Sequence, residues 1–268
     1  MPRYPRSSAE LHDLSEAARR FVLPGCTTDQ IFEKTDRFWT LGSCFAANIS
    51  RALTEQGIIN DFTHLEEASN SPNALEEITG DILRGSSRLL SMGAIEELRT
   101  NITGVSGIVV TCGVGATPLN AAGQLSVPGE PDTWYELSVE QAESSIRNTL
   151  ANIGKVNPHA HIFLTLSPVP LNRNFWNELS PVVADCVSKS TLRIGIHRAM
   201  KGAPDNVHYW PAFEIVRWLG AHRAGHYAAD DGLQRHVSNS VVDVVIKLFL
   251  ETFFFPDSEA DDALDKYS

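Results

Sequence analysis

A serine, an aspartate and a histidine stand where a proton-relay site could form. Ser43 follows a short aromatic and β-branched run, residues 37–41, and precedes a segment with apolar residues at helical spacing. A serine at such a strand-to-helix turn is held exposed, next to the free N–H groups and partial positive charge of the helix N-terminus. Asp231 and His236 lie in a polar stretch before the last expected helix. A nearby histidine could take the serine proton and an aspartate could orient that histidine, so the three are a candidate triad.

The same positions have ordinary structural explanations. A serine that follows a strand often caps the next helix, and the spacing of the three residues does not by itself separate the two roles. Cys44, beside Ser43, could also be considered as a thiol nucleophile. At the start of a helix its side chain should point away from that of Ser43. We therefore interpret Cys44 as a small buried hydrophobe that lends its backbone N–H.

Two pairs of histidines have spacings that can bind metals. His222 and His226 are four apart with Gly225 between them, and His159 and His161 are two apart at the start of an expected strand. Neither pair has a Cys or carboxylate placed to complete a tetrahedral set. We expect no metal and no other cofactor.

Lys189 and Arg193 lie four apart on one face of an expected helix. Such spacing predicts a solvated or ion-paired helix face. Binding of an anionic substrate is the alternative interpretation.

Alternating strand and helix patterns predict an α/β fold. Apolar runs bounded by glycines or polar residues are typical of strands buried on both faces, and crossovers of helical length favour parallel pairing. We expect one domain with a doubly wound, mostly parallel sheet and helices on both faces, a flavodoxin-like three-layer α/β/α arrangement. The expected strands, side by side, are residues 37–41, 107–112, 161–166 and 206–210.

Capping residues and charge spacing define several of the expected helices. Ser138 and Gln141 form a capping box, and Ser180 with Pro181 starts a helix that runs to about residue 200. The last helix begins near residue 237. In the apolar stretch 241–255 the charged side chains recur every four residues, which predicts a buried helix with one wet stripe formed by Asp243, Lys247 and Glu251.

Sites in such sheets form beyond the carboxyl ends of the strands. Ser43, Gly113 and Ser167 follow the first, second and third expected strands, and the polar segment 230–236 precedes the last helix. We expect these four places to meet at one edge of the sheet.

Composition excludes several classes of protein. The chain has 268 residues with 22 Lys and Arg against 33 Asp and Glu, a net charge of −11, and shows no basic stripe, so a nucleic-acid binder is not expected. With 43% hydrophobic and 21% charged residues it is not wholly disordered. Four cysteines without a CxxC form neither a disulfide framework nor a zinc site.

The ends of the chain suggest its location and organisation. The first residues lack the apolar core of a secretory signal, and the stretch 241–255 is too short and too charged to span a bilayer, so we expect a cytoplasmic protein with no membrane span. The expected organisation is an N-terminal helical extension over 1–29, the α/β domain over 30–255, and an acidic, disordered tail over 256–268.

A series of short motifs resembles one protein family. Gly42-Ser43-Cys44-Phe45-Ala46 is similar to the signature of the GSCFA family, a branch of the SGNH/GDSL hydrolase superfamily. Further blocks resemble elements of that family in the same order over about residues 30 to 250: 70–72 (NSP), 111–113 (TCG), 157–158 (NP), 164–171 (LTLSPVPL), 188–193 (SKSTLR), 209–214 (YWPAFE) and 236–238 (HVS).

The resemblance implies an SGNH-hydrolase-like fold and roles for several residues. Ser43 would be the nucleophile and His236 the general base, at a distance that allows proton exchange, roughly 3 Å. The oxyanion hole would include the N–H of Cys44, with Asn70 and Gly113 as further contributors. The implied activity is that of an esterase or O-acyltransferase on the acyl ester of a polar small molecule or carbohydrate. A non-catalytic ligand-binding module on the same fold is the alternative.

Two departures from the family pattern concern this site. The superfamily usually has Asp three residues before the histidine, but Leu233 stands there. The nearest acids are Asp231 and Asp230, so either a longer loop brings Asp231 to His236, or serine and histidine act as a dyad. Asp205 stands three residues before His208, but we expect His208 to be a strand residue.

The second departure follows Gly113. The family usually has a Glu and a Trp after the glycine, whereas residues 114–118 here read VGATP. One wall of the pocket is therefore expected to differ.

Overall fold

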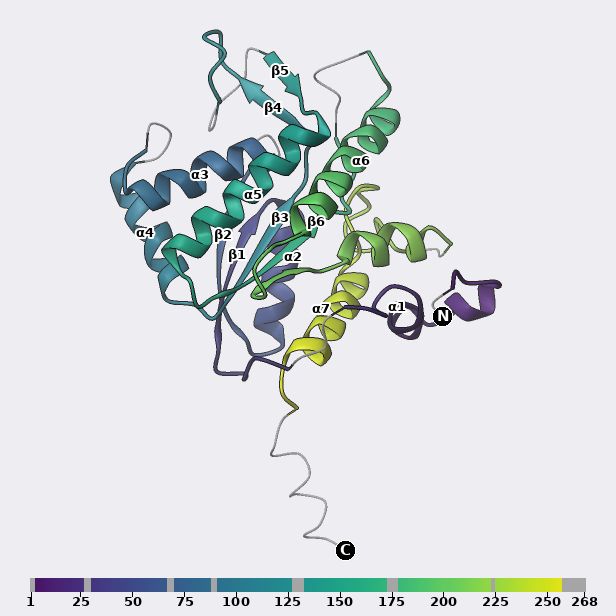
Figure 1. The fold of residues 1–268 in the computed structure, drawn as a ribbon. Helices are drawn as coiled ribbons and strands as arrows, with labels where there is room; N and C mark the ends of the chain where they lie inside the picture. Colours follow the sequence, from purple (N-terminus) through teal and green to yellow (C-terminus); the bar gives the residue numbers. More distant parts are fainter. Residues whose placement is uncertain are drawn as a thin grey trace, which may run out of the picture.

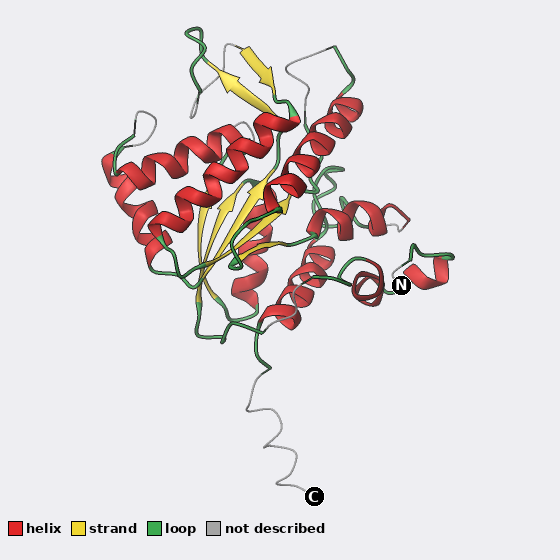
Figure 2. Ribbon diagram, in the orientation of Figure 1, coloured by secondary structure: helices red, strands yellow, loops and turns green. Residues whose placement is uncertain are grey.

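Five strands form one parallel sheet in the order β2-β1-β3-β6-β7 (Figures 1 and 2). The computed structural model describes residues 3–26, 30–66, 70–87, 91–126, 133–172, 178–222 and 225–256. All four neighbouring pairs run parallel. This confirms the expected α/β fold. The strands are β1 (Arg37–Gly42), β2 (Ile59–His64), β3 (Gly107–Cys112), β6 (His161–Leu166) and β7 (Val207–Tyr209).

The four expected strands lie side by side as predicted, and β2 is an additional strand that the apolar pattern did not predict. This strand is the sheet edge and is only half-buried, so it lacks a continuous apolar run. Its polar side chains bond to neighbours. Asn60 Oδ1 accepts from Thr40 Oγ1 at 2.7 Å, and Thr63 Oγ1 accepts from Trp39 Nε1 at 2.9 Å.

Helices cover both faces of the sheet (Figure 1). One core lies between the sheet and α2, α7 and α1, and the other lies between the sheet and α3, α4, α5 and α6. The helices are α1 (Leu14–Phe21), α2 (Cys44–Glu55), α3 (Pro72–Arg84), α4 (Met92–Thr103), α5 (Val139–Val156), α6 (Pro181–Met200) and α7 (Asn239–Phe253).

Successive strand residues enter opposite cores, as the pleat of a strand requires. Val109 of β3 packs with the α2 and α7 side, whereas its neighbours Ile108 and Val110 pack with the α3 to α6 side. Phe163 of β6 likewise enters the first core, and Leu164 enters the second. Burial on both faces explains why these strands are apolar without alternation.

A second, small sheet follows Gly113. β4 (Ala116–Leu119) and β5 (Thr133–Glu136) pair antiparallel beyond the carboxyl end of β3 (Figure 1). β4 contains a proline at 118 and a threonine, so it forms no continuous apolar run of the kind that predicts a strand. The small sheet leaves the parallel core unchanged.

Several local expectations are confirmed. The capping box of Ser138 and Gln141 is formed, and α6 begins at Pro181 and ends at Met200. The three charged residues of the expected wet stripe on α7 are exposed: Asp243, Lys247 and Glu251.

The N-terminal segment packs onto the domain. Ala17 and Ala18 of α1 are buried in the same core as α7. Residues 257–268, most of the expected disordered tail, lie outside the described residues. None of the described helices has the length and apolarity needed to cross a bilayer.

Candidate active site

Ser43 and Gly113 follow the two adjacent strands at which the direction of the sheet reverses. From β1 the chain proceeds outward to β2, then returns to β3 on the other side of β1. The crevice beyond such a switch point is the usual ligand site of open α/β sheets. Ser167, which follows β6, lines the same pocket. The expectation that these strand ends meet is confirmed.

Gly42 fixes the turn that presents Ser43. Its φ is +150°, and a Cβ at this position would lie 1.9 Å from Thr111 Oγ1 and 2.9 Å from Ala46 Cβ. Only glycine avoids both contacts. The chain can therefore pass from β1 into α2 directly over β3, and Ser43 becomes the first residue after the strand.

Ser43 occupies the N-cap position of α2, yet its hydroxyl does not cap the helix. The serines at the starts of α3, α4, α5 and α6 (Ser71, Ser91, Ser138 and Ser180) each accept a backbone N–H with the side-chain oxygen. The capping explanation therefore fails for Ser43. Its hydroxyl is available for another contact, and that contact is with Asn70.

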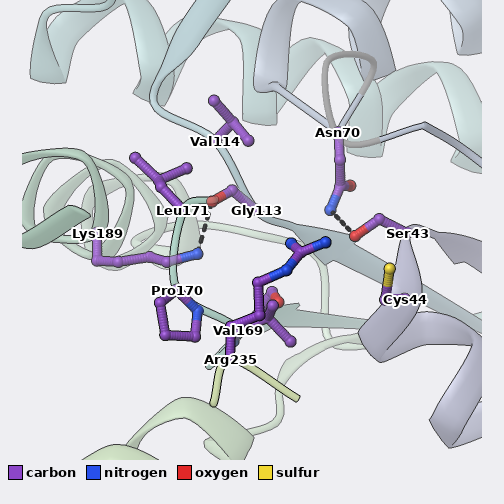
Figure 3. Close-up of a pocket in the computed structure, with 11 residues that line it drawn as sticks. Ser43, Cys44, Asn70, Gly113, Val114, Val169, Pro170, Leu171, Lys189 and Arg235 are labelled. Atoms are coloured by element: carbon purple, nitrogen blue, oxygen red, sulfur yellow. Dashed lines mark hydrogen bonds between the residues drawn. The ribbon is translucent and has the colours of Figure 1, made fainter. Parts of the chain in front are cut away.

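Asn70 holds the Ser43 hydroxyl through a buried hydrogen bond. Its Nδ2 donates to Ser43 Oγ at 2.9 Å, and Asn70 is 1% exposed (Figure 3). The Asn70 backbone oxygen accepts from the N–H groups of Gly113 and Val114, at 2.9 and 3.1 Å. These bonds fix Asn70 between the end of β3 and the serine.

Gly113 contributes space rather than a donor in this structure. Its N–H is already bonded to Asn70, and a Cβ at Gly113 would lie 2.5 Å from Asn70 Nδ2. The donors next to Ser43 are therefore the Asn70 amide, which bonds its hydroxyl, and the N–H of Cys44, the residue that follows it. Cys44 is the first residue of α2, so its N–H has no partner within the helix.

The pocket around Ser43 is small. Its volume is about 20 Å³, roughly the space that one water molecule needs. Figure 3 shows the Arg235 side chain extending into this space toward the Ser43–Asn70 pair. The lining residues are Ser43, Cys44, Asn70, Gly113, Val114, Ser167, Val169, Pro170, Leu171, Lys189 and Arg235.

Asp231 and Asp230 have different partners. His236 Nδ1 lies 2.5 Å from Asp231 Oδ2, and the Leu233 N–H donates to the other carboxylate oxygen at 2.9 Å. Asp230 Oδ2 accepts the N–H of Asn239 at 2.7 Å, at the start of α7. The longer loop thus allows Asp231 to reach the histidine, and Asp230 caps a helix.

The contact with His236 lowers the pKa of Asp231 and selects the tautomer of the neutral imidazole. Its hydrogen bond, followed by that of the Leu233 N–H, lowers the pKa of Asp231, so this carboxylate stays ionised in mild acid. An ionised carboxylate only accepts, so Nδ1 carries the proton and Nε2 of a neutral His236 carries the lone pair. This is the tautomer that a general base requires.

The expected contact between Ser43 and His236 is not formed. Within the described residues His236 Nε2 is buried and makes no hydrogen bond, and the pocket is lined by Arg235 rather than by His236. The structure therefore gathers Ser43, Cys44, Asn70 and Gly113 in one pocket. It pairs Asp231 with His236 separately.

Lys189 and Arg235 line the pocket, although the sequence suggested substrate binding by Lys189 only as an alternative and placed Arg235 only within the polar segment 230–236. Lys189 is 3% exposed, and its ammonium donates to the Gly113 carbonyl at 2.7 Å. The preceding Ser188 accepts the Gly115 N–H at 2.8 Å, so α6 holds the turn after β3. The expectation of a solvated Lys189 is wrong, because this side chain points into the fold.

The environment of Arg193 differs from that of Lys189. It pairs with Glu214 and lies over the Tyr209 ring, 4.5 Å from its centroid. Glu214 also accepts from the Tyr209 hydroxyl at 2.8 Å. Arg193 is thus ion-paired, as predicted.

Cys112 and Cys44, the two cysteines nearest the site in sequence, differ in exposure. Burial raises the pKa of Cys112, the last residue of β3, to about 12, although the Lys189 charge opposes this, so the thiol stays protonated. Cys44 is partly exposed and lines the pocket, which corrects the expectation that it is fully buried.

None of the other histidines whose side chains the structure describes lines the pocket. His208 is a strand residue, as predicted. Its Nε2 lies 3.0 Å from Nδ1 of His161. His161 is the first residue of β6, so it lies at the amino-terminal end of that strand, whereas the pocket lies beyond the carboxyl end. Burial lowers the pKa of His161. His226 is buried, whereas the His222 side chain lies outside the described part of the structure. No metal-binding cluster occurs in the part of the chain that the structure describes.

Comparison with known proteins agrees with the motifs around this site. The family model described as the GSCFA family matches residues 90–249, which is more than half of the chain. The chain belongs to the GSCFA family. The matched range contains Gly113, Lys189, Asp231, Arg235 and His236, and it begins after Ser43 and Asn70. No curated protein matches this GSCFA chain significantly.

Two solved structures resemble the fold at low identity. One is a carbohydrate esterase family 2 enzyme with a carbohydrate-binding domain from Corynascus thermopiles (Myceliophthora fergusii). It has 12% identity and a TM-score of 0.46, with 82% of this chain and 66% of that chain covered. The other is the periplasmic domain of a lipopolysaccharide acetyltransferase from Salmonella ser. Paratyphi A. It has 10% identity and a TM-score of 0.42, with 91% of this chain and 96% of that chain covered.

Proposed function

We propose that this GSCFA protein is a serine-dependent esterase or O-acyltransferase that acts on the acyl ester of a polar small molecule or carbohydrate. The observation that carries the proposal is the state of the Ser43 hydroxyl. It stands at a helix N-cap without capping, it accepts a buried amide N–H from Asn70, and it lines the pocket at the switch point of the sheet.

Ser43 is the nucleophile of the proposed reaction. Its Oγ attacks the acyl carbonyl while His236 Nε2 takes the hydroxyl proton, and the leaving alcohol departs with that proton as the acyl–oxygen bond breaks. Water or an acceptor alcohol then attacks the acyl-serine, gives a proton to His236, and releases Ser43 as its proton returns. The Asp231–His236 pair supports this role, because it leaves the Nε2 lone pair available.

The oxyanion is stabilised by groups at the start of α2 and on Asn70. The N–H of Cys44, the Asn70 amide and the partial positive charge of the helix start all lie next to Ser43. Gly113 keeps the Asn70 amide in place. These donors are fixed before substrate arrives, which is the condition for effective electrostatic stabilisation.

Catalysis requires the segment 225–238 to shift. The present cavity of about 20 Å³ is too small for an ester, and the Arg235 side chain extends into it (Figure 3). Arg235 and His236 are consecutive, so a movement that withdraws Arg235 also repositions the imidazole. Positive φ angles at Gly225 and Gly232, of +79° and +75°, provide backbone conformations suited to such a hinge.

A non-catalytic binding module is the second candidate function. The observation that favours it is the missing hydrogen bond between Ser43 and His236. A binding module needs only the pocket, whereas an esterase needs a covalent acyl intermediate on Ser43. A serine-directed covalent probe therefore separates the two candidates.

The test is labelling with a fluorophosphonate, followed by peptide mass spectrometry and assay of a short-chain aryl ester. We expect wild type to carry the adduct on Ser43 and to hydrolyse the ester, and Ser43→Ala to do neither. Ser138→Ala is a matched control, because Ser138 is an N-cap serine that does cap its helix, and it should label normally. A folded wild-type protein with neither adduct nor turnover contradicts the enzyme and leaves the binding module.

A further inference from the structure

The Ser43 pocket has the opposite charge to the chain as a whole. The protein carries a net charge of −11, yet the residues that line this pocket include two cations, Lys189 and Arg235, and no Asp or Glu. The N-terminus of α2 adds a partial positive charge beside Ser43. A pocket with low-dielectric walls concentrates such a field.

Lys189 is fixed at the inner wall of the pocket. It is 3% exposed and its ammonium donates to the Gly113 carbonyl at 2.7 Å, so it stays close to the end of β3 (Figure 3). Burying an ammonium is unfavourable unless polar or anionic groups surround it. The Lys189 ammonium therefore places a positive charge at this wall of the pocket.

Arg235 is the second cation that lines the pocket. Figure 3 shows its guanidinium inside the pocket, on the side of Ser43 and Asn70. A guanidinium presents a planar fork of donors that matches a carboxylate or phosphate. Since Arg235 occupies the space that a substrate needs, an anionic group on the substrate would pair with it as the segment shifts.

We propose that the ester accepted at Ser43 carries an anionic group, a carboxylate or a phosphate, that binds Arg235 within the field of Lys189. This inference rests on the proposed function, because it names the substrate class of the same site. It predicts that the site discriminates between esters that differ only in charge.

The experiment compares three acetyl esters of para-substituted phenols: 4-acetoxybenzoate, its neutral methyl ester, and 4-acetoxyphenyl phosphate. Each kcat/KM is divided by the rate of spontaneous hydrolysis, which removes the intrinsic reactivity of the leaving phenol. We expect wild type to favour at least one anionic ester over the neutral ester by about 10- to 100-fold, the range that charge-assisted hydrogen bonds support. Whichever anion is favoured identifies the carboxylate or the phosphate as the recognised group.

Variants locate the preference. Arg235→Gln should reduce the ratio of anionic to neutral kcat/KM by about tenfold or more, and Arg235→Lys should retain part of it. Arg37→Gln is the matched control, because Arg37 is an exposed arginine at the start of β1, paired with Asp61, and its loss changes the net charge equally. This control should keep the wild-type ratio. Added salt should lower the ratio in wild type, because it screens the attraction.

The outcomes separate this inference from the proposed function. A Ser43 adduct with equal normalised rates for all three esters, or an anion preference that Arg235→Gln leaves intact, overturns the anionic substrate and leaves the esterase. Absence of both adduct and turnover overturns the proposed function, and this inference with it.

Discussion

Replacing Gly113 with alanine would put a methyl group where the Asn70 amide now lies. The new Cβ would be 2.5 Å from Asn70 Nδ2 and 3.2 Å from Asn70 Cγ, both closer than an ordinary contact. The Asn70 side chain would have to turn away, and its hydrogen bond to Ser43 Oγ would break. The nearby backbone bonds from the Gly113 and Val114 N–H groups to Asn70 would be disturbed less, because they belong to the main chain.

The expected size of the effect follows from the two roles of that amide. Loss of one oxyanion donor typically lowers kcat by about 10²- to 10³-fold, and we expect Gly113→Ala to fall in that range. Loss of one buried hydrogen bond should lower the free energy of unfolding by only about 1–2 kcal/mol, so the protein stays folded. The variant thus separates catalysis from stability.

The assay measures kcat and KM with a short-chain aryl ester, together with thermal unfolding. Gly154→Ala is the control, because a Cβ at Gly154 of α5 meets no atom within 4 Å. Alanine there should leave kcat unchanged and stabilise the helix by up to about 1 kcal/mol. A Gly113→Ala protein whose kcat stays within threefold of wild type would refute the role of Asn70.

Three further predictions concern titratable side chains. Asp231→Ala should lower kcat more than about 100-fold, because the His236 ring loses the carboxylate that orients it. Asp230→Ala should keep the wild-type kcat and lower the free energy of unfolding by about 1 kcal/mol, because it removes a helix cap. Equal kcat values for the two variants would contradict the role given to Asp231. The pKa of His161 is lowered by burial, so the unfolded chain binds more protons below pH about 6.5 and acid destabilises the fold. When the pH is lowered from 7.5 to 5.5, the melting temperature of His161→Leu should therefore fall less than that of wild type. Parallel plots of melting temperature against pH for the two proteins would contradict this prediction. Iodoacetamide should modify the exposed Cys186 in the native protein and leave the buried Cys112, whose pKa is about 12, unmodified. Mass spectrometry after brief labelling measures the modification of each cysteine, and equal modification of the two would contradict the prediction.

Much of the sheet could be predicted because its central strands are buried on both faces. Continuous apolar runs identify β3 and β6 without any knowledge of their neighbours. β2 could not be found in this way, because its polar side chains satisfy tertiary partners. The hydroxyl of Thr63 accepts from the Trp39 indole, and the Asn60 amide oxygen accepts from Thr40. Such partners depend on the fold and leave no local pattern.

The site was predictable to a similar extent. Strand-to-helix spacing identifies Ser43, and the family motifs add Asn70 and Gly113. Which of Asp231 and Asp230 contacts His236 depends on the path of the loop between them and the histidine. The sequence alone therefore cannot assign that contact to one of two adjacent acids. The burial of Lys189 depends on how α6 packs over the turn after β3, which helical spacing alone does not reveal.

The acyl-enzyme on Ser43 is the most direct test of the central claim. An aryl acetate is mixed with the protein, the reaction is quenched in acid during turnover, and the peptides are mapped by mass spectrometry. We predict an acetyl group on Ser43 that appears with the released phenol and is absent from Ser43→Ala. Turnover without a covalent intermediate, or an acetyl group on the neighbouring Cys44 in its place, would contradict the account.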